Sequence, residues 1–139
     1  MRSLLLVLAM ALGMPALADP AVLRPVNELR VAQGHAPMVY APSLENAALL
    51  HAIDMAQRKY FAHEGRDGST VGQRVTAQGY EWCLVAENIA KGQRSLDQVM
   101  QDWAESPGHL ANMIRPELRE IGVARGPGHL WVMVLAAPC

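Results

Sequence analysis

Two histidines and one glutamate are the residues of this chain best suited to chemistry. His63 ends the segment YFAH, Glu87 lies in the apolar segment LVAENIA, and His109 follows directly on Ser-Pro-Gly. Each is in or beside an expected loop, where functional side chains concentrate. Two imidazoles and a carboxylate can ligate zinc, and they equally suit a general base with a positioned acid. Because they form no local metal motif such as HExxH, a third interpretation stays open, in which each satisfies nearby backbone groups separately.

Helical periodicity predicts the elements that position these residues. The strongest helix covers residues 43–60, with Ser43 as its expected N-cap. His51 falls on the apolar stripe of this helix, so we expect a buried histidine with one hydrogen-bond partner instead of a ligand. Further helices are expected over residues 21–34, 71–79 and 95–105.

A helix stop precedes His109. Ser95 and Gln98 form the sequence pattern of a capping box at the start of the preceding helix. Ser106-Pro107-Gly108 is expected to end that helix and redirect the chain, so that His109 points into a cleft. The segment HLANMI would add another turn. A nucleophilic pair of Ser106 with His109 is the less favoured interpretation, because a Pro-Gly turn separates the two.

The C-terminal third reads as two strands, over residues 119–126 and 129–138, joined by a Gly-Pro-Gly turn. The second is apolar on both faces, which indicates a strand covered on both sides. A further short strand is expected within residues 82–90, and residues 35–42 are expected to form a loop. The predicted fold is therefore α/β, a three-layer α/β/α sandwich with a small central sheet.

The N-terminus has the pattern of a secretory signal. A basic Arg2, an apolar run over residues 4–12 and the small residues of ALA predict a signal peptide over residues 1–18. Residues 19–139 would then form a single domain in the periplasm or outside the cell, without a permanent membrane span. An uncleaved anchor is disfavoured because the apolar run is short for a bilayer. The formal net charge of −1 and the absence of a basic block give no indication of nucleic acid as a partner.

The chain has two cysteines, Cys83 and Cys139. An even number of cysteines in an exported chain favours a disulfide over two free thiols. The bond would tie the last residue back to the middle of the chain.

Six segments carry a family resemblance: VNELRVAQG, LLHAIDMAQRKYFAHEGRDG, RVTAQGY, AENIAKG, VMQDWAESPGHLANMI and EIGVARG. In this order and spacing, over residues 22–136, the chain resembles a bacterial member of the CAP superfamily. This is the group of cysteine-rich secretory proteins, antigen 5 and pathogenesis-related 1 proteins that share the SCP domain. The resemblance implies an α/β/α sandwich, in agreement with the pattern of elements.

The resemblance also implies a cleft with two histidines and two acidic residues that can hold a divalent metal. The two histidines and one acid correspond to His63, His109 and Glu87. The position of the second acid is occupied by Ser106, for which Glu105 could substitute only after a local shift. Zinc is the metal that this residue set favours.

Asn112 lies one helical turn after His109, where it is expected to brace the imidazole or a neighbouring loop.

Three functions are compatible with these residues. We favour a secreted, non-enzymatic binding module whose cleft takes an apolar, lipid-like molecule or an extracytoplasmic protein, because the resemblance implies such partners. The alternative is a zinc-assisted hydrolase in which zinc-bound water is the nucleophile and Glu105 is the local candidate for a base. The third is a disulfide-tied scaffold whose histidines and glutamate form only a hydrogen-bond network.

Overall fold

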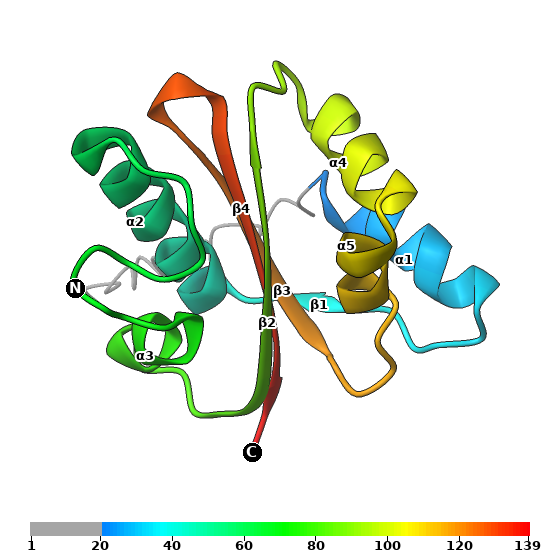
Figure 1. Ribbon diagram of the computed structural model, residues 1–139. Helices are drawn as coiled ribbons and strands as arrows, with labels where there is room; N and C mark the ends of the chain where they lie inside the picture. Colours follow the sequence, from blue (N-terminus) through cyan, green and yellow to red (C-terminus); the bar gives the residue numbers. More distant parts are fainter. Residues whose placement is uncertain (1–20) are drawn as a thin grey trace, which may run out of the picture.

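A four-stranded mixed sheet separates two groups of helices in the computed structural model, which describes residues 21–139 (Figure 1). The predicted signal peptide lies outside these residues. The strand order is β1-β3-β4-β2, with β1 parallel to β3 and the other pairs antiparallel. The strands are β1 (Val39–Tyr40), β2 (Trp82–Lys91), β3 (Glu120–Gly126) and β4 (Leu130–Pro138).

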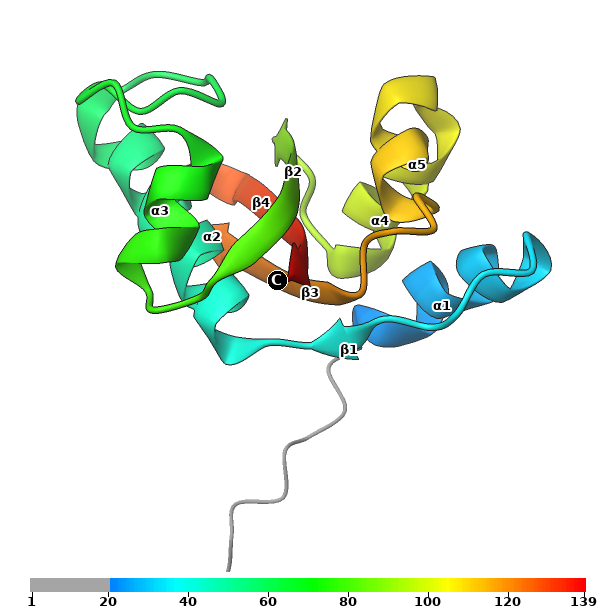
Figure 2. The same ribbon diagram turned by 90° about the horizontal axis from the view of Figure 1, so that it is seen from below.

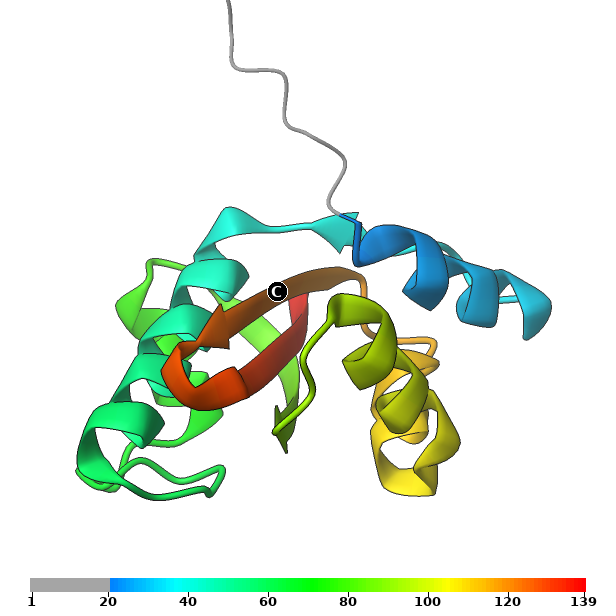
Figure 3. The ribbon, with the colours of Figure 1, turned by 90° about the horizontal axis from the view of Figure 1, so that it is seen from above.

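Helices cover both faces of the sheet. α2 (Pro42–Arg58) and α3 (Val71–Ala77) lie on one face. On the other lie α1 (Leu23–Ala32), α4 (Leu96–Glu105) and α5 (Pro107–Met113). Figures 2 and 3 show these two groups on opposite sides of the strands. The predicted three-layer α/β/α sandwich is confirmed. Within residues 21–139, no helix combines the length and the hydropathy that a membrane span requires.

The central strand β4 supplies both halves of the core. Its even-numbered residues from Leu130 to Ala136 pack against α2 and α3. Its odd-numbered residues Trp131, Met133 and Leu135 pack against α1, α4 and α5. Because successive side chains of a strand point to opposite faces, an unbroken apolar run is what this two-sided position requires.

Two helix starts differ from the sequence expectation. α2 begins at Pro42 with Ala41 as its N-cap, so the prediction of Ser43 as cap is wrong. Proline suits the first helical position because its missing N–H has no partner there in any case. At α4, Ser95 does accept a hydrogen bond from the Gln98 N–H, but the Gln98 side chain accepts from the Arg94 N–H, so the capping box is only half formed.

The helix stop before His109 is also a helix start. α4 ends at Glu105 as predicted, and Ser106 serves both as its C-cap and as the N-cap of α5. Pro107 takes the first position of α5, so Ser-Pro-Gly joins two consecutive helices and changes the direction between them instead of starting a loop. His109 is therefore a first-turn residue of a helix.

Two extended segments are longer or more regular than predicted. The predicted loop over residues 35–42 contains β1, which pairs with Glu120 and Ile121 of β3. A two-residue strand has too little period for sequence patterns to show it. β2 has 10 residues and pairs with β4 along its length, whereas only a short strand was expected there.

The Cys83–Cys139 disulfide is confirmed, with the two Cα atoms 4.8 Å apart. It joins the start of β2 to the residue that follows β4. The Cys139 N–H also donates to the Glu81 carbonyl oxygen at 3.3 Å. The chain end is thus fixed to the sheet by one covalent bond and one hydrogen bond.

Replacing both cysteines with serine is expected to lower the free energy of unfolding by about 4 kcal/mol, because the bond closes a long loop and restricts the unfolded chain. The two cysteines are 56 residues apart. Urea unfolding of the variant and of the reduced wild type measures the effect, and the two should agree. Equal stability of the oxidised wild type and the double variant would contradict the expectation.

Candidate functional site

Glu87 is the centre of a buried polar cluster between β2 and the α2–α3 layer. Its side chain is 2% exposed. Its Oε1 accepts a hydrogen bond from Nδ1–H of His63 at 2.8 Å, and its Oε2 accepts from Nη2 of Arg74 at 2.8 Å. The Nε2 atom of His51 lies 3.9 Å from Oε1. A buried carboxylate is stable only with such partners, because its desolvation is costly.

Strand alternation places Glu87 in this layer. Val85 and Ile89, two residues to either side on β2, pack into the same α2–α3 half of the core. Glu87 therefore faces α2 and α3, while Asn88 faces the opposite layer. His63 comes from the loop after α2, and Arg74 comes from α3. The start of α3 is fixed by a complete capping box between Thr70 and Gln73.

His51 is the buried histidine that the sequence predicts, with 1% of its surface exposed. Its Nε2 atom forms a hydrogen bond of 2.9 Å with the Ala62 carbonyl oxygen. Burial lowers its pKa below the usual 6.5. It positions the loop that carries His63 and borders the Glu87 carboxylate.

A second network on the opposite face of β2 fixes His109. The Asn112 amide donates to Oδ1 of Asn88 at 2.9 Å and to the Glu87 carbonyl oxygen at 3.4 Å. The Asn88 amide in turn donates to the His109 carbonyl oxygen at 3.1 Å. Asn112 thus braces β2 and, through Asn88, the backbone of α5. Of the two expected partners, the imidazole or a neighbouring segment, these bonds go to the neighbouring segment, β2.

Ser106 and Glu105, the two options for a fourth cleft residue, have different surroundings. Ser106 Oγ lies 2.8 Å from Nδ1 of His109, a hydrogen bond across the first turn of α5. Glu105 is exposed and accepts from the Gln101 amide at 2.9 Å. Within residues 21–139, Glu105 forms no hydrogen bond or ion pair with His63, Glu87 or His109.

The pKa values of His63 and His109 shift in opposite directions from the ordinary value for histidine. The hydrogen bond to Glu87 is the main cause that raises the pKa of His63 above 6.5. Burial, followed by the positive charge of His63, lowers the pKa of His109 below 6.5. The structure therefore joins His63 directly to Glu87, whereas the ring of His109 bonds to Ser106.

We expect a nuclear magnetic resonance titration to give a pKa above 6.5 for His63 and pKa values below 6.5 for His51 and His109. In Glu87→Gln the His63 pKa should fall, because the carboxylate that stabilises the imidazolium is gone. The exposed neighbour Glu64 offers a control, since Glu64→Gln leaves the hydrogen bond in place. An unchanged His63 pKa in Glu87→Gln would contradict the geometry.

The raised pKa of His63 determines how its contribution to stability changes with pH. The folded protein holds the His63 proton more tightly than the unfolded chain does. The contribution of His63 to stability is therefore fully present below the unfolded pKa of about 6.5 and is lost as the pH rises through the folded pKa. His51 and His109 act in the opposite sense, and their contributions are lost as the pH falls below about 6.5.

The zinc site stays a prediction, and the positions of the candidate ligands bear on it. Within residues 21–139, no three His, Cys, Asp or Glu side chains are grouped as metal ligands. Both carboxylate oxygens of Glu87 are hydrogen-bonded to groups of this chain, and Nδ1 of His109 is hydrogen-bonded to Ser106. Catalytic zinc sites use three protein ligands.

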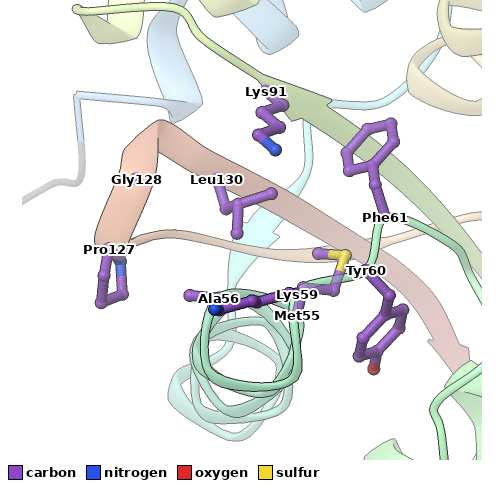
Figure 4. A pocket seen from close by; sticks show the side chains of 9 residues that line it. All are labelled: Met55, Ala56, Lys59, Tyr60, Phe61, Lys91, Pro127, Gly128 and Leu130. Carbon is purple, nitrogen blue, oxygen red and sulfur yellow. The ribbon is translucent and has the colours of Figure 1, made fainter.

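A pocket of about 470 Å³ lies between the C-terminal end of α2, the end of β2 and the β3–β4 turn. Figure 4 shows Lys59 and Lys91 on different sides of this pocket, with Phe61 and Leu130 on its walls. The remaining lining residues are Met55, Ala56, Tyr60, Pro127 and Gly128. Its size is within the range of small-molecule sites.

Sequence reasoning missed Arg74 and the position of His51 beside the carboxylate. A signal for Arg74 was available: it follows Val71 by three residues and directly precedes Val75, so it lies next to the buried side of α3. No sequence signal links it to Glu87, 13 residues away.

Comparison with known proteins agrees with the fold. The family model described as the cysteine-rich secretory protein family (CAP) matches residues 23–134. The protein YkwD of Bacillus subtilis is 30% identical over 106 residues, which is 76% of this chain and 41% of that relative. This chain thus spans well under half of that relative's length.

Solved structures resemble it as well. An outer surface protein from Borrelia burgdorferi has a TM-score of 0.76 at 23% identity, covering 85% of this chain and 90% of that one. An extracellular protein containing a SCP domain from Bacillus anthracis has a TM-score of 0.75 at 22% identity, covering 80% of this chain and 37% of that one. With the family model matched over most of the described residues, this chain belongs to the cysteine-rich secretory protein (CAP) family.

Proposed function

We propose that this chain is a non-enzymatic binding domain that acts outside the cytoplasm and takes an apolar ligand carrying an anionic group. One observation carries the choice of ligand. The whole chain contains two lysines, Lys59 and Lys91, and both line the 470 Å³ pocket. Among the residues that the structure describes, no acidic side chain lines it.

The two lysines are free to meet a ligand. Within the described residues neither forms an ion pair, and both are exposed. They come from different elements, the end of α2 and the end of β2. Two cations over an apolar pocket complement a molecule with a hydrocarbon body and a carboxylate at one end.

The pocket wall itself points to a ligand. Phe61 is 48% exposed although it is a large apolar side chain. Lys59 has φ 55°, a left-handed conformation that glycine or asparagine adopts at lower cost at a helix end. Because the backbone there does not favour lysine, its presence supports a role for the side chain.

Binding is favoured over hydrolysis by the state of Glu87. A hydrolytic carboxylate must be free to accept a proton or to hold a metal, and both oxygens of Glu87 are engaged by Arg74 and His63. The Ser106–His109 hydrogen bond resembles a nucleophile–base pair. Within residues 21–139, however, the His109 ring has no further hydrogen-bond partner to orient it, and an activated serine needs that third group.

Location outside the cytoplasm is supported by three observations. The N-terminal pattern is that of a secretory signal. The disulfide is typical of oxidising compartments. Two structural neighbours are described as an extracellular protein and an outer surface protein.

Fluorescence titration with a dansyl-labelled fatty acid tests the proposal. We expect saturable one-to-one binding that weakens about tenfold or more in the double variant Lys59→Ala/Lys91→Ala and at high salt. Arg94→Ala removes an exposed cation elsewhere and should leave the affinity unchanged. No saturable binding by the folded wild type, or equal binding by the double variant, would contradict the ligand class.

An ester of the same acid separates binding from catalysis. The ester lacks the anionic group, so it should bind more weakly than the acid and remain intact. Turnover of the ester that is lost in His109→Ala would overturn the non-enzymatic proposal and favour a hydrolase.

A further inference from the structure

Glu87 needs a cation, and the chain supplies one. Its carboxylate is 2% exposed and lies against the apolar half of the core that Val85 and Ile89 help to form. A buried carboxylate without a positive partner is strongly destabilising. Arg74 provides that charge at 2.8 Å from Oε2.

Arg74 is held in place by more than its charge. Nη1 donates to the Ser69 carbonyl oxygen at 2.9 Å, and Nη2 donates to the His63 carbonyl oxygen at 2.9 Å. Its side chain is 12% exposed, and it starts from a helix whose N-terminus has a complete capping box. The guanidinium is therefore a fixed part of the cluster, in contrast to an exposed salt bridge whose partners exchange with water.

A divalent cation would have to share the carboxylate with this guanidinium. Arg74 occupies Oε2, and His63 occupies Oε1 through Nδ1–H. A metal at Oε2 would have to displace the guanidinium or remain beside it as a like charge in a poorly solvated site. Within residues 21–139, no three His, Cys, Asp or Glu side chains are grouped as metal ligands, whereas stable zinc sites have three or four.

We propose that Arg74 is the built-in cation of this cluster, that it takes the place of a divalent metal at Glu87, and that its removal frees the Glu87 carboxylate beside His63 for a metal. The inference does not depend on the lysine pocket, because Lys59 and Lys91 are not part of it. The protein with Arg74 and the metal-bound variant would share the carboxylate of Glu87 and the imidazole of His63. They would differ only in the cation that neutralises Glu87.

Calorimetric titration with zinc tests this inference on four proteins. The wild type should bind zinc weakly or without saturation. Arg74→Met keeps the length of the side chain and removes its charge, and it should bind one zinc about tenfold or more tightly than the wild type. Arg74→Met/Glu87→Gln should lose that gain, because the freed carboxylate is gone. Arg58→Met makes the same change at an exposed arginine and should behave as the wild type does.

The result expected in Arg74→Met can be followed by a second signal. Cobalt(II) bound at a new site of imidazole and carboxylate should give visible absorption, absent in the wild type and in the double variant. A folded Arg74→Met with no gain in zinc affinity would overturn the inference. If Arg74→Met fails to fold, zinc titration of the wild type and of His63→Ala still tests the inference. Micromolar one-to-one zinc binding that is lost in His63→Ala would overturn it, and weak binding unchanged in His63→Ala would support it.

Discussion

Replacing Arg30 with methionine is expected to lower the free energy of unfolding by about 5 kcal/mol. Arg30 is 1% exposed, and its guanidinium donates four hydrogen bonds to backbone carbonyl oxygens. Each buried carbonyl left without a donor costs roughly 1–3 kcal/mol. Methionine fills most of the volume, so the loss would come from these orphaned oxygens and not from a cavity.

The four bonds of Arg30 connect α1 to the rest of its layer. The acceptors are the carbonyl oxygens of Ala36, Met113, Arg115 and Leu118, at 2.8–3.1 Å. They lie after α1, at the end of α5 and in the turn that leads to β3. Within residues 21–139 no carboxylate pairs with Arg30, and burial lowers its pKa. The guanidinium thus supplies hydrogen-bond donors to carbonyl oxygens of two separate segments, residue 36 and residues 113–118.

Urea unfolding measures this effect, and Arg24→Met is the matched control. Arg24 lies on the same helix but is exposed, and its only ion pair within residues 21–139 is an i,i+4 contact with Glu28. Removing it should change stability by about 0.5 kcal/mol or less. Arg30→Lys retains the charge but loses most of the hydrogen bonds, so it should fall between. Similar stabilities of the Arg30 and Arg24 variants would show that the carbonyl contacts contribute little.

The parts of the fold that the sequence predicts are those with a strong local period. β4 is recognisable because its apolar run alternates between two half-cores. α4 is recognisable because Val99, Met100 and Trp103 recur at helical spacing and are all buried. In both, the tertiary environment and the local pattern impose the same requirement, so sequence and structure agree.

The parts that escape prediction depend on partners far along the chain. β1 exists only because residues 39 and 40 pair with residues 120 and 121 of β3. The N-cap of α2 is a choice among Ala41, Pro42 and Ser43 that depends on how the chain leaves β1. Local propensity carries no information on either.

The candidate site divides in the same way. His63, Glu87 and His109 are identifiable because their residue types and surroundings are unusual in the sequence. Arg74 is an ordinary arginine until the fold places it on the carboxylate, and Ser106 bonds to His109 only because Pro107 continues the helical path. The partners of a buried charge are set by topology, so a site predicted from residue types alone omits the groups that neutralise it.

The close contact of α2 with β3 predicts a large loss of stability in Gly122→Ala. A Cβ atom at Gly122 would lie 2.1 Å from the Glu45 nitrogen and 2.4 Å from the Leu44 carbonyl carbon. Both are backbone atoms of the first turn of α2, which cannot move aside as the end of a flexible side chain can. The helix would have to lift away from the sheet and loosen the contacts of Leu44, Ala47 and Ala48, which are at most 2% exposed.

We therefore expect Gly122→Ala to lower the free energy of unfolding by about 4 kcal/mol or more, above the usual cost of overpacking, because the clash is with backbone. Gly108→Ala is the matched control. Among the described residues, nothing lies within 4 Å of a Cβ at Gly108, so alanine in the first turn of α5 should be neutral or add up to about 1 kcal/mol. Thermal and urea unfolding compare the two variants. A Gly122→Ala protein as stable as Gly108→Ala would mean that α2 can shift on β3. The layer that holds His51 would then be adjustable, and the fixed distances around Glu87 would need another cause.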